Sequence, residues 1–360
     1  MRDIYFFLPD YPEYSTGGIM YQQKIYEYAK KKARGIEKFG EFRFVKITRK
    51  SRILKLLIGF HYISKIPRKS IIVATNTEHI YFLLPRILFG FWKKHFYYMI
   101  ICHLTSMENK KFLRDFVEHI FIRKADYLTT ISETTEITLF ENKLINKKIE
   151  VIPPGIEYKA LYYLPERDEN IYKLLCVGSI EERKGLIYVI EVMNKLKNRN
   201  FELNIAGKIL SNEYYDLLIE KNREYNIEDK VNFLGKVSDE KLKELYRTSH
   251  LFIFLSIWEG YGMVVAEASS FGVPVIASRL PSLEPLLDDG YNGYYVDLND
   301  INKITEKIDL LLDDNELRKQ MSLNALKKAS GFVPWDEVCS QHFKILETLR
   351  NKLNINAKKN

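Results

Sequence analysis

The feature that most limits the fold is a regular alternation of strand-length apolar runs with longer stretches of helical periodicity. In the first half the strand candidates are residues 4–8, 42–47, 70–75, 96–101, 127–131 and 149–152. In the second half they are residues 174–177, 202–206, 231–233, 251–255 and 273–277, each followed by a helix candidate. Such alternation is typical of parallel sheets covered by helices on both faces. We therefore predict an α/β protein with two doubly wound, Rossmann-like domains.

The two sets of strands are separated by Pro153-Pro154-Gly155 and by a polar stretch at residues 165–170. A chain of 360 residues has room for two domains of ordinary size. We expect an N-terminal domain over residues 1–165, a C-terminal domain over residues 166–340, and a C-terminal helix over residues 341–360.

Composition excludes several classes of protein. An apolar share of 46% and a charged share of 28% are typical of a soluble globular chain, and no run of about 18 apolar residues predicts a membrane span. No signal peptide is expected, because Met1-Arg2-Asp3 leads directly into a strand candidate. Three widely spaced cysteines, Cys102, Cys176 and Cys339, favour buried thiols in a reducing compartment. We expect a cytoplasmic protein.

The net charge of +8 comes entirely from the first half of the chain. Residues 1–165 carry +12, from 28 Lys and Arg against 16 Asp and Glu, whereas the remainder carries −4. This asymmetry indicates either an anionic partner for the first half or a lysine-rich surface that only aids solubility.

Two basic segments with apolar and aromatic side chains, residues 49–57 and 86–94, lie in that half. Such segments suit the surface of an anionic membrane. They are equally compatible with ordinary helices whose apolar sides face the core. Peripheral contact with the inner face of a membrane is therefore a hypothesis, and no nucleic-acid partner is expected.

The most informative motif is a pair of acids, Glu259 and Glu267, around the turn that follows the strand candidate 251–255. Parallel sheets bind ligands at this edge, beyond the carboxyl ends of the strands. Gly260 and Gly262 allow backbone N–H groups to approach an anion, and the following helix adds its dipole. Two acids then suit the hydroxyl-rich ends of a ligand with a charged middle. A nucleotide sugar has this layout.

Further motifs accompany this pair in a characteristic order. They are Gly17-Gly18, His103, Ala125-Asp126-Tyr127 with Ser132, Ile152-Pro153-Pro154-Gly155-Ile156-Glu157, Val177-Gly178-Ser179 with Arg183-Lys184-Gly185, Phe233-Leu234-Gly235, and Gly272-Val273-Pro274-Val275-Ile276-Ala277. With them the chain resembles, over almost its whole length, the family-4 retaining glycosyltransferases, also called glycosyl transferases group 1, of the GT-B fold.

The resemblance implies two Rossmann-like domains facing across a cleft, with the donor in the C-terminal domain and the acceptor in the N-terminal one. It also implies that the last helix crosses back to the first domain. The expected reaction is a retaining, metal-independent transfer from a nucleoside-diphosphate sugar, with uridine the favoured base, to a hydroxyl acceptor. Family relatives often glycosylate lipids or lipid-linked saccharides from the cytoplasmic face, and a lipid-linked saccharide or a polysaccharide is therefore the expected acceptor. No cofactor is expected, because the nucleotide sugar is itself a substrate.

The resemblance also assigns roles to residues. Arg183 and Lys184 would grip the donor diphosphate, although Ser179 replaces the arginine that the family often has there. Glu267 would accept hydrogen bonds from the ribose, and Glu259 would lie against the transferred sugar. His103 would contact the donor sugar and orient the acceptor. The remaining donor-binding candidates are glycines and turn residues: Gly17, Gly18, Gly178, Gly235, Lys236, Gly260, Tyr261, Gly262, Met263 and Val264.

No metal site is expected, because the chain has neither an Asp-X-Asp motif nor a His/Cys cluster of ligand spacing. Three alternatives stay open. A nicotinamide dehydrogenase would use Gly260-X-Gly262, but its third glycine is replaced by Val265. A GT-B-fold nucleotide-sugar isomerase would share the donor site. A catalytically silent nucleotide-sugar-binding subunit would not need Arg183, Lys184 and both acids.

Overall fold

The computed structural model describes residues 4–10, 17–33, 42–48, 61–75 (except 62, 64 and 68), 95–104, 112–167 and 170–358. The chain divides into two compact units, one of residues 1–155 with 333–360 and one of residues 156–332. The divisions expected from the sequence, after residues 165 and 340, lie somewhat later in the chain. Each unit is described by itself.

The first unit is built on a parallel sheet in the order β2-β1-β3-β4-β5-β6. Its strands are β1 (Ile4–Asp10), β2 (Phe42–Thr48), β3 (Ile71–Thr75), β4 (Phe96–Ile101), β5 (Tyr127–Thr130) and β6 (Glu150–Val151). Every pair of neighbouring strands is parallel. Their carboxyl ends therefore meet at one edge, to which the loops carrying His103 and Ser132 belong.

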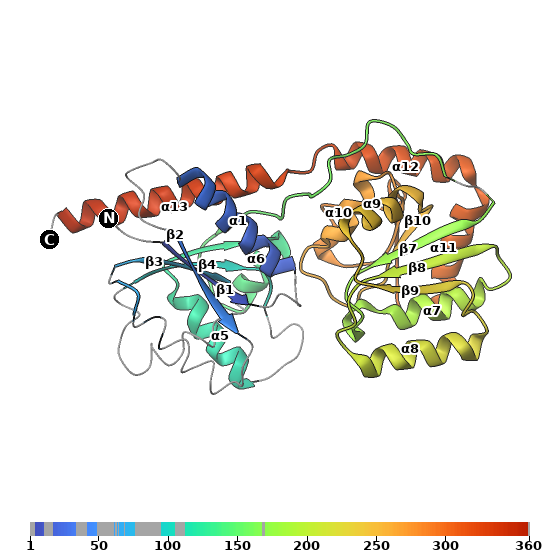
Figure 1. The fold of residues 1–360 in the computed structure, drawn as a ribbon, viewed down its shortest axis with the longest axis horizontal. Helices are drawn as coiled ribbons and strands as arrows, with labels where there is room; N and C mark the ends of the chain where they lie inside the picture. The colour runs from blue at the N-terminus through green and yellow to red at the C-terminus, as the bar shows by residue number, and fades with distance from the viewer. Residues whose placement is uncertain are drawn as a thin grey trace. The chain divides into compact units, whose positions relative to one another are not determined.

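Helices cover both faces of this sheet (Figure 1). One face holds α5 (Phe112–Lys124) and α6 (Glu133–Glu141), whose buried Phe121 and Leu139 pack with Tyr97 and Met99 of β4. The other face holds α1 (Gly17–Ala33) and α13 (Trp335–Lys358), which pack against each other. Successive side chains of β4 point to opposite faces of the sheet, and since helices cover both faces, nearly all of them are buried.

The second unit has a parallel sheet in the order β12-β11-β10-β7-β8-β9. Its strands are β7 (Tyr172–Val177), β8 (Phe201–Ala206), β9 (Val231–Gly235), β10 (Leu251–Phe254), β11 (Val275–Ser278) and β12 (Gly293–Val296). Helices α7 (Leu186–Lys195), α8 (Asn212–Tyr225) and α11 (Ile301–Asp313) cover one face. Helices α9 (Asp239–Thr248) and α10 (Met263–Ser270) cover the other, and α12 (Asn315–Ala329) packs against α10 and α11.

These sheets confirm the predicted α/β class with two Rossmann-like domains. All the predicted strands are present, with ends shifted by a few residues. One strand, β12, was missed, because its Tyr294 and Tyr295 are only half-buried and form no clear apolar run. The three cysteines are buried, as predicted, and none of them forms a disulfide.

The two basic segments at residues 49–57 and 86–94 lie outside the described residues. Within the described part of the chain, no helix combines the length and apolar character needed to span a membrane.

A buried polar network joins α13 to the rest of the first unit. Tyr21 Oη donates to the carbonyl of Ile152 at 2.8 Å and lies 2.6 Å from His342 Nε2. Tyr98 Oη bonds to His342 Nδ1 and lies 3.2 Å from Thr129 Oγ1. Because Tyr21 gives its only proton to Ile152, it accepts one from Nε2, so Nδ1 accepts from Tyr98. Burial lowers the pKa of His342 to about 3 and keeps the ring neutral.

This network connects α1, β4, β5 and α13 with the backbone at Ile152, three residues before the chain leaves the first unit at Gly155.

We predict that His342→Ala destabilises the first unit by about 2–4 kcal/mol, because two buried tyrosine hydroxyls lose a partner and a cavity remains. Hydrogen exchange followed by mass spectrometry should reveal faster exchange in α1 and α13 and unchanged exchange in β7 to β10. His61→Ala, at an exposed position, is the matched control. Equal protection of α13 in the two variants would contradict the prediction.

Candidate functional site

The predicted site in the second unit lies where the strand order reverses. β7 is the first strand of this sheet, and the chain adds β8 and β9 on one side of it and β10 to β12 on the other. Ligands of open α/β sheets bind beyond the carboxyl ends of the strands at such a point. The segments that follow β7 and β10 therefore form the candidate site.

Two glycines bring the basic pair Arg183-Lys184 to the end of β10. These residues form a single 3₁₀ turn, Glu182–Lys184, and Gly185 follows it with a φ of 62°. A Cβ at Gly185 would lie 1.9 Å from the carbonyl oxygen of Leu255. A Cβ at Gly178 would lie 3.3 Å from Lys184 Cε. The absence of side chains at Gly178 and Gly185 thus lets the lysine cross the space between β7 and β10.

Lys184 and Glu259, which are far apart in sequence, form an ion pair. Lys184 Nζ lies 2.6 Å from Glu259 Oε2, and Arg183 Nη1 lies 3.5 Å from the same oxygen. Burial would raise the pKa of Glu259, but the two cations outweigh burial and hold it below its ordinary value. The carboxylate is therefore ionised at neutral pH, in a half-buried position where charges interact strongly.

Arg183 has further partners that fix its direction. Its Nη2 donates to Glu181 Oε1 at 2.9 Å and its Nη1 to the carbonyl of Trp258 at 3.3 Å. Its guanidinium carbon lies 5.8 Å from the centre of the Trp258 ring. The sequence interpretation did not include Glu181 or Trp258, since neither belongs to a recognisable motif.

The loop after β10 ends in a helix start that is open to an anion. Gly260 N donates to Glu259 Oε1 at 3.1 Å. Gly262 has a φ of 89° and precedes α10 with no side-chain cap. The positive φ favours glycine there, and a Cβ would also lie 2.4 Å from Leu283 Cδ2 and displace that side chain. The first amides of a helix, here from Met263 and Val264, are the groups that bind anions in many proteins.

Glu267 lies on α10 and accepts a hydrogen bond from Tyr246 Oη at 2.9 Å. Burial raises the pKa of Glu267 to about 7, and the acids Glu157 and Asp239 add to the rise. The hydrogen bond from Tyr246 opposes it. An acid with this pKa titrates near neutral pH, which is a feature of functional sites.

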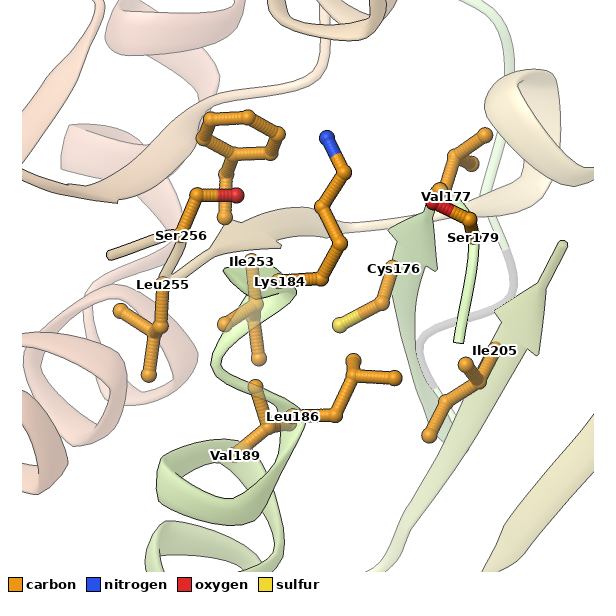
Figure 2. Close-up of a pocket in the computed structure, with 12 residues that line it drawn as sticks. Cys176, Val177, Ser179, Lys184, Leu186, Val189, Ile205, Ile253, Leu255 and Ser256 are labelled. Carbon is orange, nitrogen blue, oxygen red and sulfur yellow. The ribbon is translucent and has the colours of Figure 1, made fainter. Parts of the chain in front are cut away.

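A small pocket lies at the carboxyl ends of β7 and β10, with a volume of about 10 Å³, enough for about one water molecule. Figure 2 shows the Lys184 side chain crossing it between Ser256 and Ser179, above apolar Leu186 and Val189. The aliphatic part of the lysine thus packs on the core while its ammonium group points away from it.

Two other donor-binding candidates lie at the same edge of this sheet but farther along it. Gly235 ends β9, the outermost strand, with a φ of 63° and nothing within 4 Å of its missing Cβ. Lys236 follows it and is exposed. The structure therefore brings Gly178, Arg183, Lys184 and Glu259 together, and places Gly235 and Lys236 on the far side of β8.

The remaining candidates belong to the first unit. Gly17 and Gly18 begin α1, and His103 follows β4 in a half-buried position. A Cβ at Gly18 would lie 3.1 Å from Cys102 Sγ, so the start of α1 lies close to the end of β4. These residues share the carboxyl edge of the first sheet.

The chemistry of the site in the second unit is that of a receptor for an anion flanked by hydroxyl groups. Arg183 and Lys184 are cations that an anion can bind, although Glu181 and Glu259 offset their charge in this structure, and the uncapped start of α10 adds its dipole. Glu259 and Glu267 are carboxylates that can accept hydrogen bonds from hydroxyl groups. Lys184 is already paired with Glu259, so an incoming anion must compete for it or share it.

Comparison with known proteins follows this geometry. Residues 165–328 match the family model described as glycosyl transferases group 1. An uncharacterised glycosyltransferase of Methanocaldococcus jannaschii is 31% identical over 169 residues, which are 47% of this chain and 43% of that protein. The chain thus matches less than half the length of that relative.

Two solved structures share the whole fold. Sucrose-phosphate synthase from Thermosynechococcus elongatus aligns with a TM-score of 0.79 at 18% identity, covering 98% of this chain and 100% of that one. HepE from Anabaena, solved in complex with UDP and glucose, aligns with a TM-score of 0.77 at 15% identity, covering 97% and 100%. At these identities the likeness establishes the fold, which is GT-B.

The raised pKa of Glu267 predicts a pH-dependent cost to stability. The ordinary pKa of glutamate is near 4.5 and the folded value is about 7, so the folded state binds the proton more tightly. Stability from this group is complete below pH 4.5 and is lost as the pH rises through 7. Glu267→Gln should therefore stabilise the protein at pH 8, by about 1–3 kcal/mol, and have little effect at pH 4. Melting temperatures across this range, with the exposed Glu228→Gln as control, test this. A stability difference between Glu267→Gln and the wild type that does not change with pH would count against it.

Proposed function

We propose that this chain, which matches the family model of the glycosyl transferases group 1 over residues 165–328, transfers a sugar from a nucleoside-diphosphate sugar to a hydroxyl acceptor. The proposed reaction retains the anomeric configuration and needs no metal ion or other cofactor. In it the bond between the anomeric carbon and the diphosphate oxygen breaks, and the acceptor oxygen bonds to the same face of that carbon. The acceptor proton passes to the departing diphosphate.

The observation that carries this proposal is the position of Arg183, Lys184 and Glu259 together at the strand-order reversal. Negative charge grows on the diphosphate as the sugar leaves, and fixed cations near it lower the barrier. Lys184 and Arg183 are the cations proposed for this role. Glu259 is proposed to position the transferred sugar and stabilise positive charge on it, and His103 to contact the donor sugar and orient the acceptor.

Uridine is the base proposed for the donor. Complexes of similar structures support this proposal, since HepE was solved with UDP and glucose and the pneumococcal O-GlcNAc transferase GtfA with UDP and GlcNAc. In this proposal the amides at the start of α10 receive the diphosphate, Glu267 accepts from the ribose hydroxyls, and Gly17 and Gly18 let the start of α1 approach phosphate. The sugar itself and the linkage formed stay open.

We predict that Lys184→Ala lowers the rate of donor turnover more than it weakens donor binding, because the charge that Lys184 meets is greatest in the transition state. A loss of about 2–4 kcal/mol of transition-state stabilisation is expected. The measurement is release of nucleoside diphosphate from a panel of nucleotide sugars, in buffer containing EDTA. The control variant is Lys197→Ala, at an exposed position in the turn after α7.

A Lys184→Ala variant that raised only the Michaelis constant would contradict the assigned role. Complete loss of wild-type turnover in EDTA would contradict the metal-independent mechanism. Release of an altered sugar without any acceptor would identify an isomerase instead. Nucleotide-sugar binding with no turnover on any acceptor would identify a silent binding subunit.

The acceptor is proposed to be a lipid-linked saccharide or a polysaccharide, reached from the cytoplasmic face of a membrane. This proposal rests on the charge of +12 carried by residues 1–165 and on the basic, aromatic segments at residues 49–57 and 86–94. Each lysine or arginine near an anionic bilayer contributes about 1 kcal/mol to binding.

We predict that the protein co-sediments with vesicles containing anionic phospholipid at physiological salt, and that Lys93→Glu with Lys94→Glu weakens this binding at least tenfold. Vesicles of neutral phospholipid provide the control for the lipid. Lys319→Glu with Lys327→Glu on α12 provides the control for a change of net charge. Binding that does not depend on Lys93 and Lys94, or no binding at all, would remove the membrane proposal and favour a soluble acceptor.

A further inference from the structure

A buried tyrosine on α9, Tyr246, contacts the carboxylate that is proposed to bind the ribose. Its hydroxyl donates to Glu267 Oε2 at 2.9 Å. Its ring stacks on Phe271, with centroids 5.4 Å apart and an interplanar angle of 11°, and meets Tyr158 edge-on at 6.3 Å. A buried ring in contact with neighbouring rings has little freedom, so the direction of its hydroxyl is fixed.

The surroundings of Glu267 work against its charge, and Tyr246 works for it. Burial, with smaller contributions from Glu157 and Asp239, raises the pKa of Glu267 to about 7, although the hydrogen bond from Tyr246 opposes the rise. Burial, and then the charge of Glu267, raise the pKa of Tyr246 well above its ordinary value. Tyr246 therefore stays protonated and acts only as a donor to the carboxylate.

The other titratable and charged groups recorded around this carboxylate come from two elements. Asp239 begins α9, and Glu157 and Tyr158 belong to the segment with which the second unit starts. Lys243 Nζ lies 5.4 Å from the centre of the Tyr158 ring. Within the described residues, the side chain that donates a hydrogen bond to the Glu267 carboxylate is that of Tyr246.

The charge state of Glu267 matters for the ligand class it would take. An ionised carboxylate only accepts hydrogen bonds, and can receive both hydroxyls of a vicinal diol. A protonated carboxyl presents a donor at one oxygen and loses part of that capacity. With Oε2 bound to Tyr246, Oε1 and the free lone pair of Oε2 remain for the ligand.

We propose that Tyr246 is a positioning residue of the donor site, which favours the ionised form of Glu267 and orients it toward the vicinal hydroxyls of the nucleoside. The proposal rests on the proposed function, because it takes the nucleotide sugar as the ligand. Tyr246 touches no reacting atom in this account. It acts on the ligand through Glu267.

The experiment is calorimetric titration of the full chain with UDP from pH 6 to pH 9, for the wild type, Tyr246→Phe and Tyr158→Phe. Tyr158→Phe is the matched control, because it removes a nearby hydroxyl that has no recorded bond to Glu267. The nucleotide's own titration affects all three proteins equally, so the ratio of affinities at each pH isolates the protein.

Tyr246→Phe should bind UDP about tenfold more weakly at pH 7, the loss expected for one hydrogen bond to a charged group. The loss of UDP affinity in Tyr246→Phe should become smaller toward pH 9, where Glu267 is ionised in both proteins. The pH at which binding is half-maximal should therefore be higher in Tyr246→Phe than in the wild type. Tyr158→Phe should leave the midpoint in place. The proposal would be overturned if the affinity loss in Tyr246→Phe were the same at every pH, or if the pH dependence of UDP binding did not change. An equal shift of this pH dependence in Tyr158→Phe would also overturn it.

A second measurement separates this inference from the proposed function. Carbon-13 NMR of the glutamate carboxyl groups, with Glu267 assigned by Glu267→Gln, follows its titration without nucleotide. A higher pKa of Glu267 in Tyr246→Phe than in the wild type supports the role of Tyr246 in holding the charge, and an unchanged pKa overturns it. Wild-type protein that binds no UDP at any pH would overturn the uridine donor, while the NMR result still decides whether Tyr246 sets the charge of Glu267.

Discussion

The candidate site depends on one ion pair, between Lys184 and Glu259. It joins the turn after β7 to the loop after β10, two segments that meet only because these strands are neighbours in the sheet. Lys184 and Arg183 hold the pKa of Glu259 below its ordinary value in a half-buried position, where an unpaired charge would be costly. An anionic ligand would compete with Glu259 for Lys184, because the ammonium group that pairs with Glu259 is also the group proposed to bind the ligand. The glycines at 178 and 185 are required by the same arrangement.

The sheets and the basic pair could be predicted from the sequence because their signals are local. Strand-length apolar runs, the Gly-X-Gly turn and the order of the motifs were enough to predict two Rossmann-like domains and the site edge. The partners of the predicted residues were not accessible in this way. Tyr246 contacts Glu267, and Glu181 contacts Arg183. The fold brings these side chains together, and no spacing in the sequence predicts the contacts. β12 was missed because tyrosines that are half-buried do not form an apolar run.

The first unit has its own organising interaction, the neutral His342 between Tyr21 and Tyr98. It fixes α13 on the sheet and holds the backbone at Ile152, just before the chain leaves this unit. A sequence pattern indicates a final helix but not the side chain that anchors it, since a lone histidine on an amphipathic helix has no distinctive spacing. Both units therefore contain isolated polar contacts within a regular α/β fold, and these contacts could not be predicted from the sequence.

The central claim is that Lys184 is the anion ligand and that Glu259 holds it in the absence of ligand. The most direct test is a calorimetric double-mutant cycle with UDP, which has no sugar for Glu259 to contact. The account predicts that Glu259→Gln binds UDP several-fold more tightly than the wild type, because Lys184 is released from its partner. It also predicts that Lys184→Ala binds UDP more weakly, and that the double variant resembles Lys184→Ala. If Glu259→Gln weakened UDP binding as much as Lys184→Ala does, the account would be contradicted.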